Sequence, residues 1–366
     1  MQVPHSNPFQ IRSFASGPAA IPAEVLAEVR RDLADWSGGG LSILELPFAG
    51  AEFTEIQDEA ETDLRLLLGL PSHFRVLFLQ GGASAHFSLV PLNLLSEGDV
   101  AAYVETGYWS ARAVRQARRV CRVHIAARGQ RAIPPFDTWR VANGAGYCHI
   151  TTNEAADGLQ FHDVPDLNGV PLVADMTADL LTRPVDFARY GLVYASAQKN
   201  LGTAGLTVVI VRDDLLGHAR PGTPAPFDYA LQAKERSRVN TPPMFAIYLM
   251  GRMLKWLQRL GGLAAVAERN LRKSSRLYDA IESSEFYVCP IPRRDRSNVN
   301  VCFRLPTASL TTEFLEAARS RGLVHLSGHH SVGGIRASLY NAVPEEAVEL
   351  LAGFMDEFAR ACRKRI

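Results

Sequence analysis

The sequence predicts an α/β protein in which a large unit holds a mostly parallel sheet between helices and a smaller α+β unit follows it. Short apolar runs alternate with helical patterns over most of the chain, which is typical of a parallel sheet covered on both faces. The chain has 366 residues, enough for two domains. Its 47% hydrophobic and 21% charged residues are ordinary for a soluble globular protein.

Helices are expected first. Ser16-Gly17-Pro18 is expected to form a turn, and Pro22 opens a helix whose apolar face carries Val25, Leu26, Val29 and Leu33. The glycines at 38–40 end that helix. A second helix is expected over 53–69, because acidic residues lie early in it and Arg65 lies late.

Strands and helices then alternate. Apolar runs predict seven strands, at 76–79, 100–104, 122–126, 147–150, 170–174, 192–195 and 207–211. Helices are expected from about Ala85 and over 112–119. The seven strands are expected to form the mostly parallel sheet of the large unit.

A long helix over 244–260 leads into the second unit. Strands are expected there at 286–289, 298–303 and 335–339, and helices over 310–321 and 344–363. We therefore divide the chain into a large domain, 14–260, and a small C-terminal domain, 261–366. The segment 14–40 is expected to be able to pack with the small domain.

Charge and cysteine content exclude several classes of protein. The net charge is +1, so the chain as a whole has no electrostatic preference for nucleic acid or for an anionic membrane. The five cysteines are scattered without CxxC spacing, which indicates reduced thiols in a cytoplasmic protein and no metal site. The polar N-terminus has no apolar signal core, and no uncharged apolar run approaches the roughly 20 residues that span a bilayer.

A lysine and an aspartate follow neighbouring predicted strands. Lys199 lies just past the run 192–195, and Asp175 ends the run 170–174. This pair suits pyridoxal phosphate, since a lysine amine forms a Schiff base with its aldehyde and a carboxylate keeps its ring nitrogen protonated. A lysine after a strand is also commonly a solvated loop residue, so the spacing alone leaves both interpretations open.

Other segments are individually weak signals. The small residues 81–85 join a strand to a helix start, where backbone N–H groups suit a phosphate, yet many such turns bind nothing. Trp109 follows a strand and suits ring stacking, but tryptophan is more often core. The segment 153–158 is a turn, and Asn240-Thr241 resembles a helix cap. Arg336, among apolar neighbours, suits either a carboxylate ligand or an internal salt bridge.

In chain order, these motifs resemble the phosphoserine aminotransferase family, a group of class V, fold-type I pyridoxal phosphate enzymes. The resemblance runs from about Phe14 to the C-terminus. The segments 196–200 (Ser-Ala-Gln-Lys-Asn) and 336–342 (Arg-Ala-Ser-Leu-Tyr-Asn-Ala) are specific to it, and the other motifs support it.

The resemblance implies roles for the cofactor-side residues. Lys199 would form the Schiff base and carry the proton between the substrate Cα and the cofactor, and Asp175 would hold the ring nitrogen. Trp109 would stack on the ring. The cofactor phosphate would be held by Ala83, Ser84 and Gln198.

It also implies a shared active site. Asn240 and Thr241 would reach the cofactor phosphate of a neighbouring subunit, so a homodimer is expected. Ser16 and Arg336 would face the substrate, with Arg336 on the α-carboxylate.

The sequence departs from the family where the substrate phosphate should bind. Phe48 and Ala49 stand where the family carries a His-Arg pair, and His329-His330 stand where it carries a second His-Arg pair. Two arginines are therefore missing, and each charge-assisted hydrogen bond contributes about 1.5–3 kcal/mol. On the cofactor side, Ala155 replaces a threonine that donates to the ring hydroxyl, and His86 replaces a glutamine.

These observations predict an aminotransferase whose 2-oxo acid substrate is not phosphohydroxypyruvate, and the resemblance alone implies glutamate as the amino donor. His329 and His330, when protonated, would still bind a modest anion. One alternative is an ordinary phosphoserine aminotransferase with a rearranged phosphate site. Another is a pyridoxal phosphate lyase or desulfurase, which usually needs a reactive cysteine; Cys302 lies in a predicted strand and Cys289 beside a proline. A binding protein on an inactive fold is disfavoured, because Lys199 and Asp175 are both present.

Overall fold

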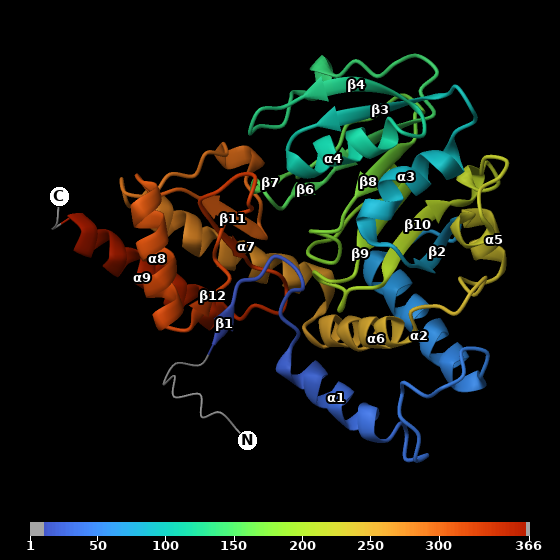
Figure 1. Ribbon diagram of the computed structural model, residues 1–366, viewed down its shortest axis with the longest axis horizontal. Helices are drawn as coiled ribbons and strands as arrows, with labels where there is room; N and C mark the ends of the chain where they lie inside the picture. The colour runs from blue at the N-terminus through green and yellow to red at the C-terminus, as the bar shows by residue number, and fades with distance from the viewer. Residues whose placement is uncertain (1–10, 364–366) are drawn as a thin grey trace.

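The computed structural model describes residues 11–363 and places seven of the strands in one central sheet (Figure 1). Along the sheet the order is β2 (Phe74–Leu79), β10 (Thr207–Arg212), β9 (Leu192–Ser196), β8 (Leu172–Asp175), β5 (Tyr147–Thr151), β3 (Val100–Glu105) and β4 (Arg122–Arg128). Only β10 runs antiparallel to its neighbours in this sheet. The prediction of a mostly parallel, seven-stranded sheet is confirmed.

Helices cover both faces of the sheet because alternate strand residues are apolar on both sides. In β10, Val208 and Ile210 pack into one core while Val209 and Val211 pack into the other. Four helices contribute to the first core: α1 (Ala23–Ala34), α2 (Ala51–Leu68), α6 (Met244–Arg259) and the start of α7 (Gly262–Glu282). The second core takes α3 (Gly82–Leu94), α4 (Tyr108–Ala117) and α5 (Tyr229–Lys234).

A separate core lies beside the sheet in the C-terminal part, drawn in orange and red in Figure 1. It is built from β11 (Asn300–Phe303), β13 (Ile335–Ser338), α8 (Ala308–Ser320), α9 (Glu345–Arg363) and the second half of α7 (Gly262–Glu282). Phe14 packs into this core, because β1 (Arg12–Ser13) pairs with β12 (Leu323–Val324). The division of the chain into domains near residue 260 stays a prediction, since α7 contributes to both cores.

The short elements complete the connections around the sheet. β6 (Asn153–Glu154) and β7 (Leu159–Gln160) form a hairpin beside β5. Five single turns of 3-10 helix punctuate the loops, at Phe136–Thr138, Phe187–Arg189, Asp213–Leu215, Ala225–Phe227 and Arg293–Asp295. Among the described residues, none of the helices is both long enough and apolar enough to cross a membrane.

Three local predictions were wrong. The buried face of α1 differs from the predicted one, because Leu26 and Leu33 are exposed. Asp32 is buried instead, and it accepts a hydrogen bond from Tyr248 Oη at 2.6 Å. The expected strand at 286–289 is a single bridge between Val288 and Arg304. Helix α7 was not predicted, since buried Asn270 and Lys273 interrupt its apolar pattern.

Lys273 fixes the loop that follows β13. Its Nζ is buried and donates to the carbonyl oxygens of Leu339, Tyr340 and Val343 at 2.8, 3.0 and 3.2 Å. The same loop reaches the sheet, because Asn341 N–H donates to Asn200 Oδ1 at 3.1 Å. The C-terminal part is thereby joined to the chain directly after Lys199.

Candidate active site

A cavity of about 220 Å³ lies between the ends of β5, β8 and β9 and the C-terminal part. It collects most of the residues that the sequence predicted for the site: Ser16, Ala83, Ser84, Trp109, Ala155, Asp175, Gln198, Lys199, His329 and Arg336. The carboxyl ends of parallel strands meet at one edge of a sheet, which is where ligands of open α/β folds bind. The sheet topology therefore explains why residues far apart in the sequence meet here.

Asp175 and Lys199 come from adjacent parallel strands. Asp175 ends β8 and pairs in register with Tyr194 of β9, and Lys199 follows β9 by three residues. The Asp175 carboxylate is buried and accepts a hydrogen bond from Thr177 N–H at 2.9 Å. Burial raises the pKa of Asp175, and the hydrogen bonds of Thr177 and the charge of Lys199 oppose that rise.

The cavity wall contains polar atoms that lack protein partners. Among the described residues, Thr151 Oγ1 and Trp109 Nε1 are buried without a hydrogen-bond partner, and both residues line the cavity. The Nζ of Lys199 lies 5.9 Å from the centroid of the Trp109 ring. A buried carboxylate, an amine, an aromatic face and free hydrogen-bonding groups fit a flat heteroaromatic cofactor with a ring N–H.

The N-terminus of α3 provides the place for a phosphate group. The chain enters the helix through Gly81 and Gly82, whose φ values of 98° and 66° lie in the left-handed region that glycine tolerates. The N-cap residue is Gly81, so it provides no side-chain cap of its own. Ser84 is exposed, while Ala83 N–H donates to Ser196 Oγ at 2.6 Å. Ser196 was not predicted as a site residue, and its hydroxyl hydrogen is left to bind an anion beside the helix end.

Two carboxylates hold Trp109 in place. Glu154 accepts hydrogen bonds from Trp109 N–H and Ser110 N–H, each at 2.8 Å, and Asp157 accepts one from Tyr108 N–H at 3.1 Å. They pack against Gly107, where an added Cβ would lie 2.6 Å from Asp157 Oδ2. The turn 153–158, which the sequence marked only as a loop, therefore caps α4 and orients the aromatic side chain in the cavity.

We expect the Glu154 side chain to make stability depend on pH. Burial raises its pKa from 4.5 to about 7, so between these values the folded protein keeps a proton that the unfolded chain releases. Stability should therefore fall as the pH rises through this window, by on the order of 3 kcal/mol from this group. Between pH 5 and 8, the thermal midpoint of the wild-type holoenzyme should fall more than that of Glu154→Gln.

The control for this measurement is Glu97→Gln, which changes an exposed acid. It should follow the wild-type pH curve. Parallel curves for wild type and Glu154→Gln would show that Glu154 does not titrate in this range.

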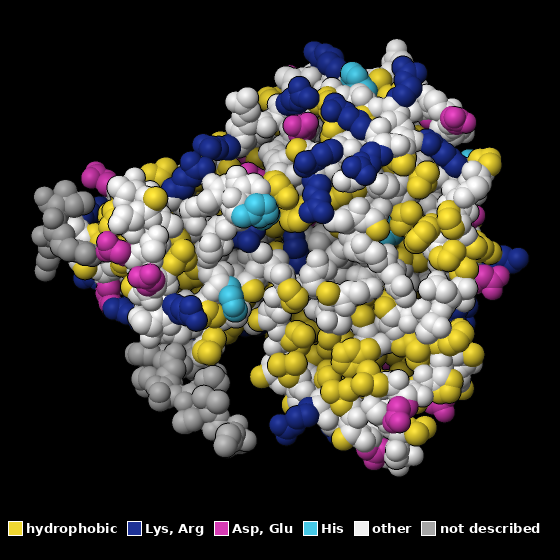
Figure 2. All heavy atoms as spheres, in the orientation of Figure 1, with side chains coloured by type: hydrophobic (Ala, Val, Ile, Leu, Met, Phe, Trp, Pro, Cys, Tyr) yellow, Lys and Arg dark blue, Asp and Glu magenta, His cyan; other side chains and the backbone are white. Residues whose placement is uncertain are grey.

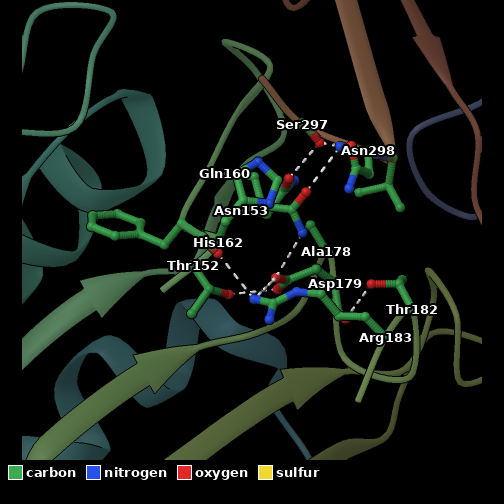
Figure 3. Close-up of polar contacts among 12 residues, drawn as sticks. Thr152, Asn153, Gln160, His162, Ala178, Asp179, Thr182, Arg183, Ser297 and Asn298 are labelled. Carbon is green, nitrogen blue, oxygen red and sulfur yellow. Dashed lines mark hydrogen bonds and ion pairs between the residues drawn. The ribbon is translucent and has the colours of Figure 1, made fainter. Parts of the chain in front are cut away.

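A buried network around Asp179 lies behind the cavity (Figure 3). The Asp179 carboxylate accepts hydrogen bonds from Thr152 Oγ1 at 2.5 Å and Gln160 Nε2 at 3.2 Å, and Arg183 lies at 3.5 Å. Thr152 N–H donates to the Asp175 carbonyl oxygen at 3.0 Å. Asp179 thus supports the backbone that carries Asp175, a role that the sequence did not indicate.

The same network ties the sheet to the C-terminal part. Gln160 Oε1 accepts a hydrogen bond from Asn298 N–H at 2.9 Å, as Figure 3 shows. Asn153 donates to Asn300 Oδ1 at 2.7 Å, and Asn300 in turn donates to Ser338 Oγ at 3.0 Å on β13. The strand that carries Arg336 is therefore held in register with the residues around the cavity.

The C-terminal part contributes the Arg336 guanidinium and the His329 imidazole to the cavity. Arg336 donates to the carbonyl oxygen of Ala155 at 3.1 Å, and no carboxylate of the described residues pairs with it. His329 packs against Tyr108 and His330, with ring centroids 4.3 and 4.1 Å apart. Burial lowers the pKa of His329, and the charges of His330, Arg336 and Arg112 lower it further. Arg336 is thus available to a carboxylate ligand, as predicted.

Five residues predicted for the site do not line the cavity of their own chain: Phe48, Ala49, Asn240, Thr241 and His330. All five are exposed. His86 is buried and hydrogen-bonded to Tyr229 Oη at 2.7 Å, so it faces a protein partner. Burial lowers the pKa of His86 to about 4, which keeps the ring neutral.

The cysteines do not support a thiol-based reaction. No cysteine lines the cavity. Cys302 is buried beneath the turn 153–158, where its Sγ lies 3.8 Å from the Ala156 carbonyl oxygen, and burial raises its pKa to about 12. A thiol with such a pKa is not a nucleophile near neutral pH. The desulfurase alternative therefore has no candidate cysteine in this cavity.

The family model described as "Aminotransferase class-V" matches residues 12–351. The chain is 50% identical to the phosphoserine aminotransferase of Acidithiobacillus ferrooxidans, with 96% of this chain and 98% of the relative covered. It is 47% identical to that of Nitrosomonas europaea, with 96% and 99% covered. A solved phosphoserine aminotransferase from Bacillus circulans subsp. alkalophilus superposes with a TM-score of 0.94 at 43% identity, covering 96% of this chain and 99% of that one.

The chain therefore belongs to the class-V aminotransferases of fold-type I, and it is an aminotransferase that depends on pyridoxal 5′-phosphate. Within that class its relatives are phosphoserine aminotransferases, which confirms the resemblance predicted from the motifs. The polar groups of the cavity described above fit this cofactor.

Proposed function

We propose that this enzyme transfers the amino group of glutamate to 3-phosphohydroxypyruvate, and the reverse. The observation that carries the proposal is a cation in the cavity: Arg336 enters it beside Ala155, with no carboxylate partner among the described residues. Glutamate and phosphoserine both carry an acidic side chain in addition to the α-carboxylate. Relatives at about 50% identity bear the name of this activity.

This proposal differs from the substrate that we expected from the sequence. That expectation rested on Phe48, Ala49 and His330, none of which lines the cavity formed by one chain. Their identities therefore remove no cation from the wall that a single chain forms, and the Ala49→Arg and His330→Arg variants below test whether these positions act across the proposed dimer interface. A non-phosphorylated acceptor stays a prediction, and the experiment below decides between the two substrates.

The cavity residues divide the chemical work. Bound pyridoxal phosphate supplies the electron sink for breaking the Cα–H bond of the amino acid. Lys199 is the single lysine of the cavity wall, and we assign to its Nζ the removal and return of the Cα proton. Asp175 would hold the cofactor ring N–H, and Trp109 and Ala155, which also line the cavity, would contact the ring.

The remaining residues would bind two anionic groups: the phosphate of the cofactor and the α-carboxylate of the substrate. The N-terminus of α3, with Ala83, Ser84 and Gln198, is placed to hold the cofactor phosphate. Arg336 would bind the substrate α-carboxylate through two parallel hydrogen bonds, which lysine cannot form. Ser16 also lines the cavity, and its carbonyl oxygen accepts a hydrogen bond from Tyr340 Oη at 3.3 Å.

The test is a set of half-reactions in which the purified holoenzyme converts one amino acid at a time. Phosphoserine and glutamate should each react at least about tenfold faster than serine and alanine, because one lost charge-assisted contact costs about that factor. If a non-phosphorylated amino acid other than glutamate reacts tenfold faster than phosphoserine, the sequence-based expectation holds instead. In that case Ala49→Arg combined with His330→Arg should raise the activity with phosphoserine.

We also propose that the enzyme acts as a homodimer. Asn240 and Thr241 are exposed in the single chain and lie outside its cavity, which suits residues that reach the cofactor phosphate of a partner. Leu41, Leu44 and Phe48 are exposed apolar side chains, 50%, 62% and 37% accessible, which an interface would cover. Light scattering should give twice the chain mass at assay concentration, and an active monomer would contradict the proposal.

A further inference from the structure

Arg112 is a cation beside the active site; it does not line the cavity of the single chain, and the reaction above assigns it no role. It lies on α4, one helical turn after Trp109, and its guanidinium carbon is 5.5 Å from the centroid of the Trp109 ring. Lys199 Nζ is 5.9 Å from the same centroid. The two cations therefore lie near the same aromatic ring, separated by no more than the sum of these two distances.

The Arg112 guanidinium has no anionic partner among the described residues. Arg112 is half-buried. Its guanidinium makes a cation–π contact with the Trp109 ring. Glu154 and Asp157, the carboxylates that contact this helix, are occupied by backbone N–H groups at its start. A partly desolvated arginine without a carboxylate is a binding group for an anion from outside the chain.

The surroundings of Arg112 favour an anion further. Its charge acts on His329, which lines the cavity and lies 6.0 Å from the Trp109 ring between centroids. In Figure 2, Lys and Arg side chains gather over the region of α4 and β4 and extend towards histidine side chains at the centre of the view. This arrangement raises the positive potential at the approach to the cavity.

We infer that Arg112 binds the anionic group at the far end of the substrate side chain, a phosphate monoester or a carboxylate, while Arg336 binds the α-carboxylate. The family resemblance implies arginines at positions 49 and 330, where this chain has Ala49 and His330. Arg112 would then supply one of these missing cations. The inference rests on the proposed function, since it presumes a substrate with an acidic side chain. The Trp109 ring fixes the direction of the guanidinium through cation–π contact.

A purely structural role makes a different prediction. If Arg112 only supports Trp109, its loss should weaken the binding of all substrates equally. Every substrate reacts at the same cofactor, on which the Trp109 ring would stack. If Arg112 binds the side-chain anion, its loss should weaken acidic substrates alone. The ratio between acidic and neutral substrates therefore separates the two roles.

The experiment compares the holoenzymes of wild type, Arg112→Gln and Arg112→Lys with the control Arg115→Gln. Arg115 is exposed on the same helix and lies further from Trp109, so its variant removes the same charge. Half-reaction rates against concentration give the apparent Kd for phosphoserine, glutamate and alanine. Arg112→Gln should raise the Kd for both acidic substrates by about tenfold or more and that for alanine by less than about twofold.

Arg112→Lys should recover part of the loss, and Arg115→Gln should change each Kd by less than about twofold. Calorimetry with inorganic phosphate gives a readout that does not depend on turnover, and Arg112→Gln should weaken phosphate binding by a similar factor. Equal losses for acidic substrates and alanine would overturn the inference and leave the proposed function intact.

The two proposals fail differently. If wild type uses alanine as well as it uses phosphoserine and glutamate, the proposed function is wrong. The phosphate titration then still tests Arg112, since unchanged binding in Arg112→Gln would overturn the inference and lost binding would establish an anion site at this residue.

Discussion

Replacement of Lys199 by alanine should abolish turnover, with a loss of at least about a thousandfold, which is within the range for a positioned acid–base group. Of the described residues 11–363, Lys199 is the one lysine that lines the cavity, so none of the other lysines in this range is in place to replace it. Its exposed fraction is 9%, which shields the amine from exchange with bulk water. The measurement is the steady-state rate together with the visible absorption of the purified protein.

Lys234→Ala is the matched control, because Lys234 is exposed on α5. It should retain the wild-type rate and spectrum. Turnover by Lys199→Ala within tenfold of wild type would remove Lys199 from the mechanism.

Replacement of Asp175 by asparagine should have the second-largest effect. The amide keeps the size of the side chain but removes the negative charge that stabilises a protonated cofactor ring, so kcat should fall by about two to three orders of magnitude. The cofactor-free protein should keep its thermal midpoint or gain a little, because burial already raises the pKa of Asp175 and disfavours its charged form. The two measurements together separate a loss of chemistry from a loss of folding.

Asp166→Asn serves as the control, since Asp166 is an exposed acid that lies before β8. It should leave the rate unchanged. A rate for Asp175→Asn within tenfold of wild type would argue that another group holds the ring nitrogen.

The sequence predicted the sheet and the cofactor side of the site for the same reason. Buried parallel strands are continuous apolar runs, so both the strands and the residues that follow them are visible in the sequence. Asp175 and Lys199 follow such runs, and β8 and β9 are neighbours in the sheet. Once β8 and β9 are known to be neighbours in the sheet, Asp175 and Lys199 are expected to lie in the same cavity.

The parts that the sequence did not reveal depend on tertiary partners. Asp179 looks like an ordinary turn residue in the sequence. In the structure it binds Gln160, and Gln160 in turn binds Asn298, which lies 138 residues after it. In α1, the burial of Asp32 depends on Tyr248, 216 residues away. Arg112 lies in the helix that the sequence predicted over 112–119, and only the position of Trp109 and His329 distinguishes it from Arg115. No local pattern carries such information.

The pairing of β1 with β12 has a consequence for how the chain is synthesised. Ser13 and His325, 312 residues apart, are joined by a hydrogen bond of 2.9 Å, and Phe14 packs among residues of the C-terminal core. During synthesis, β1 therefore cannot form its pairing until β12, near the end of the chain, has left the ribosome. Ser16, directly after that strand, can take its place at the cavity only then, so an N-terminal fragment of any length short of β12 cannot complete the site.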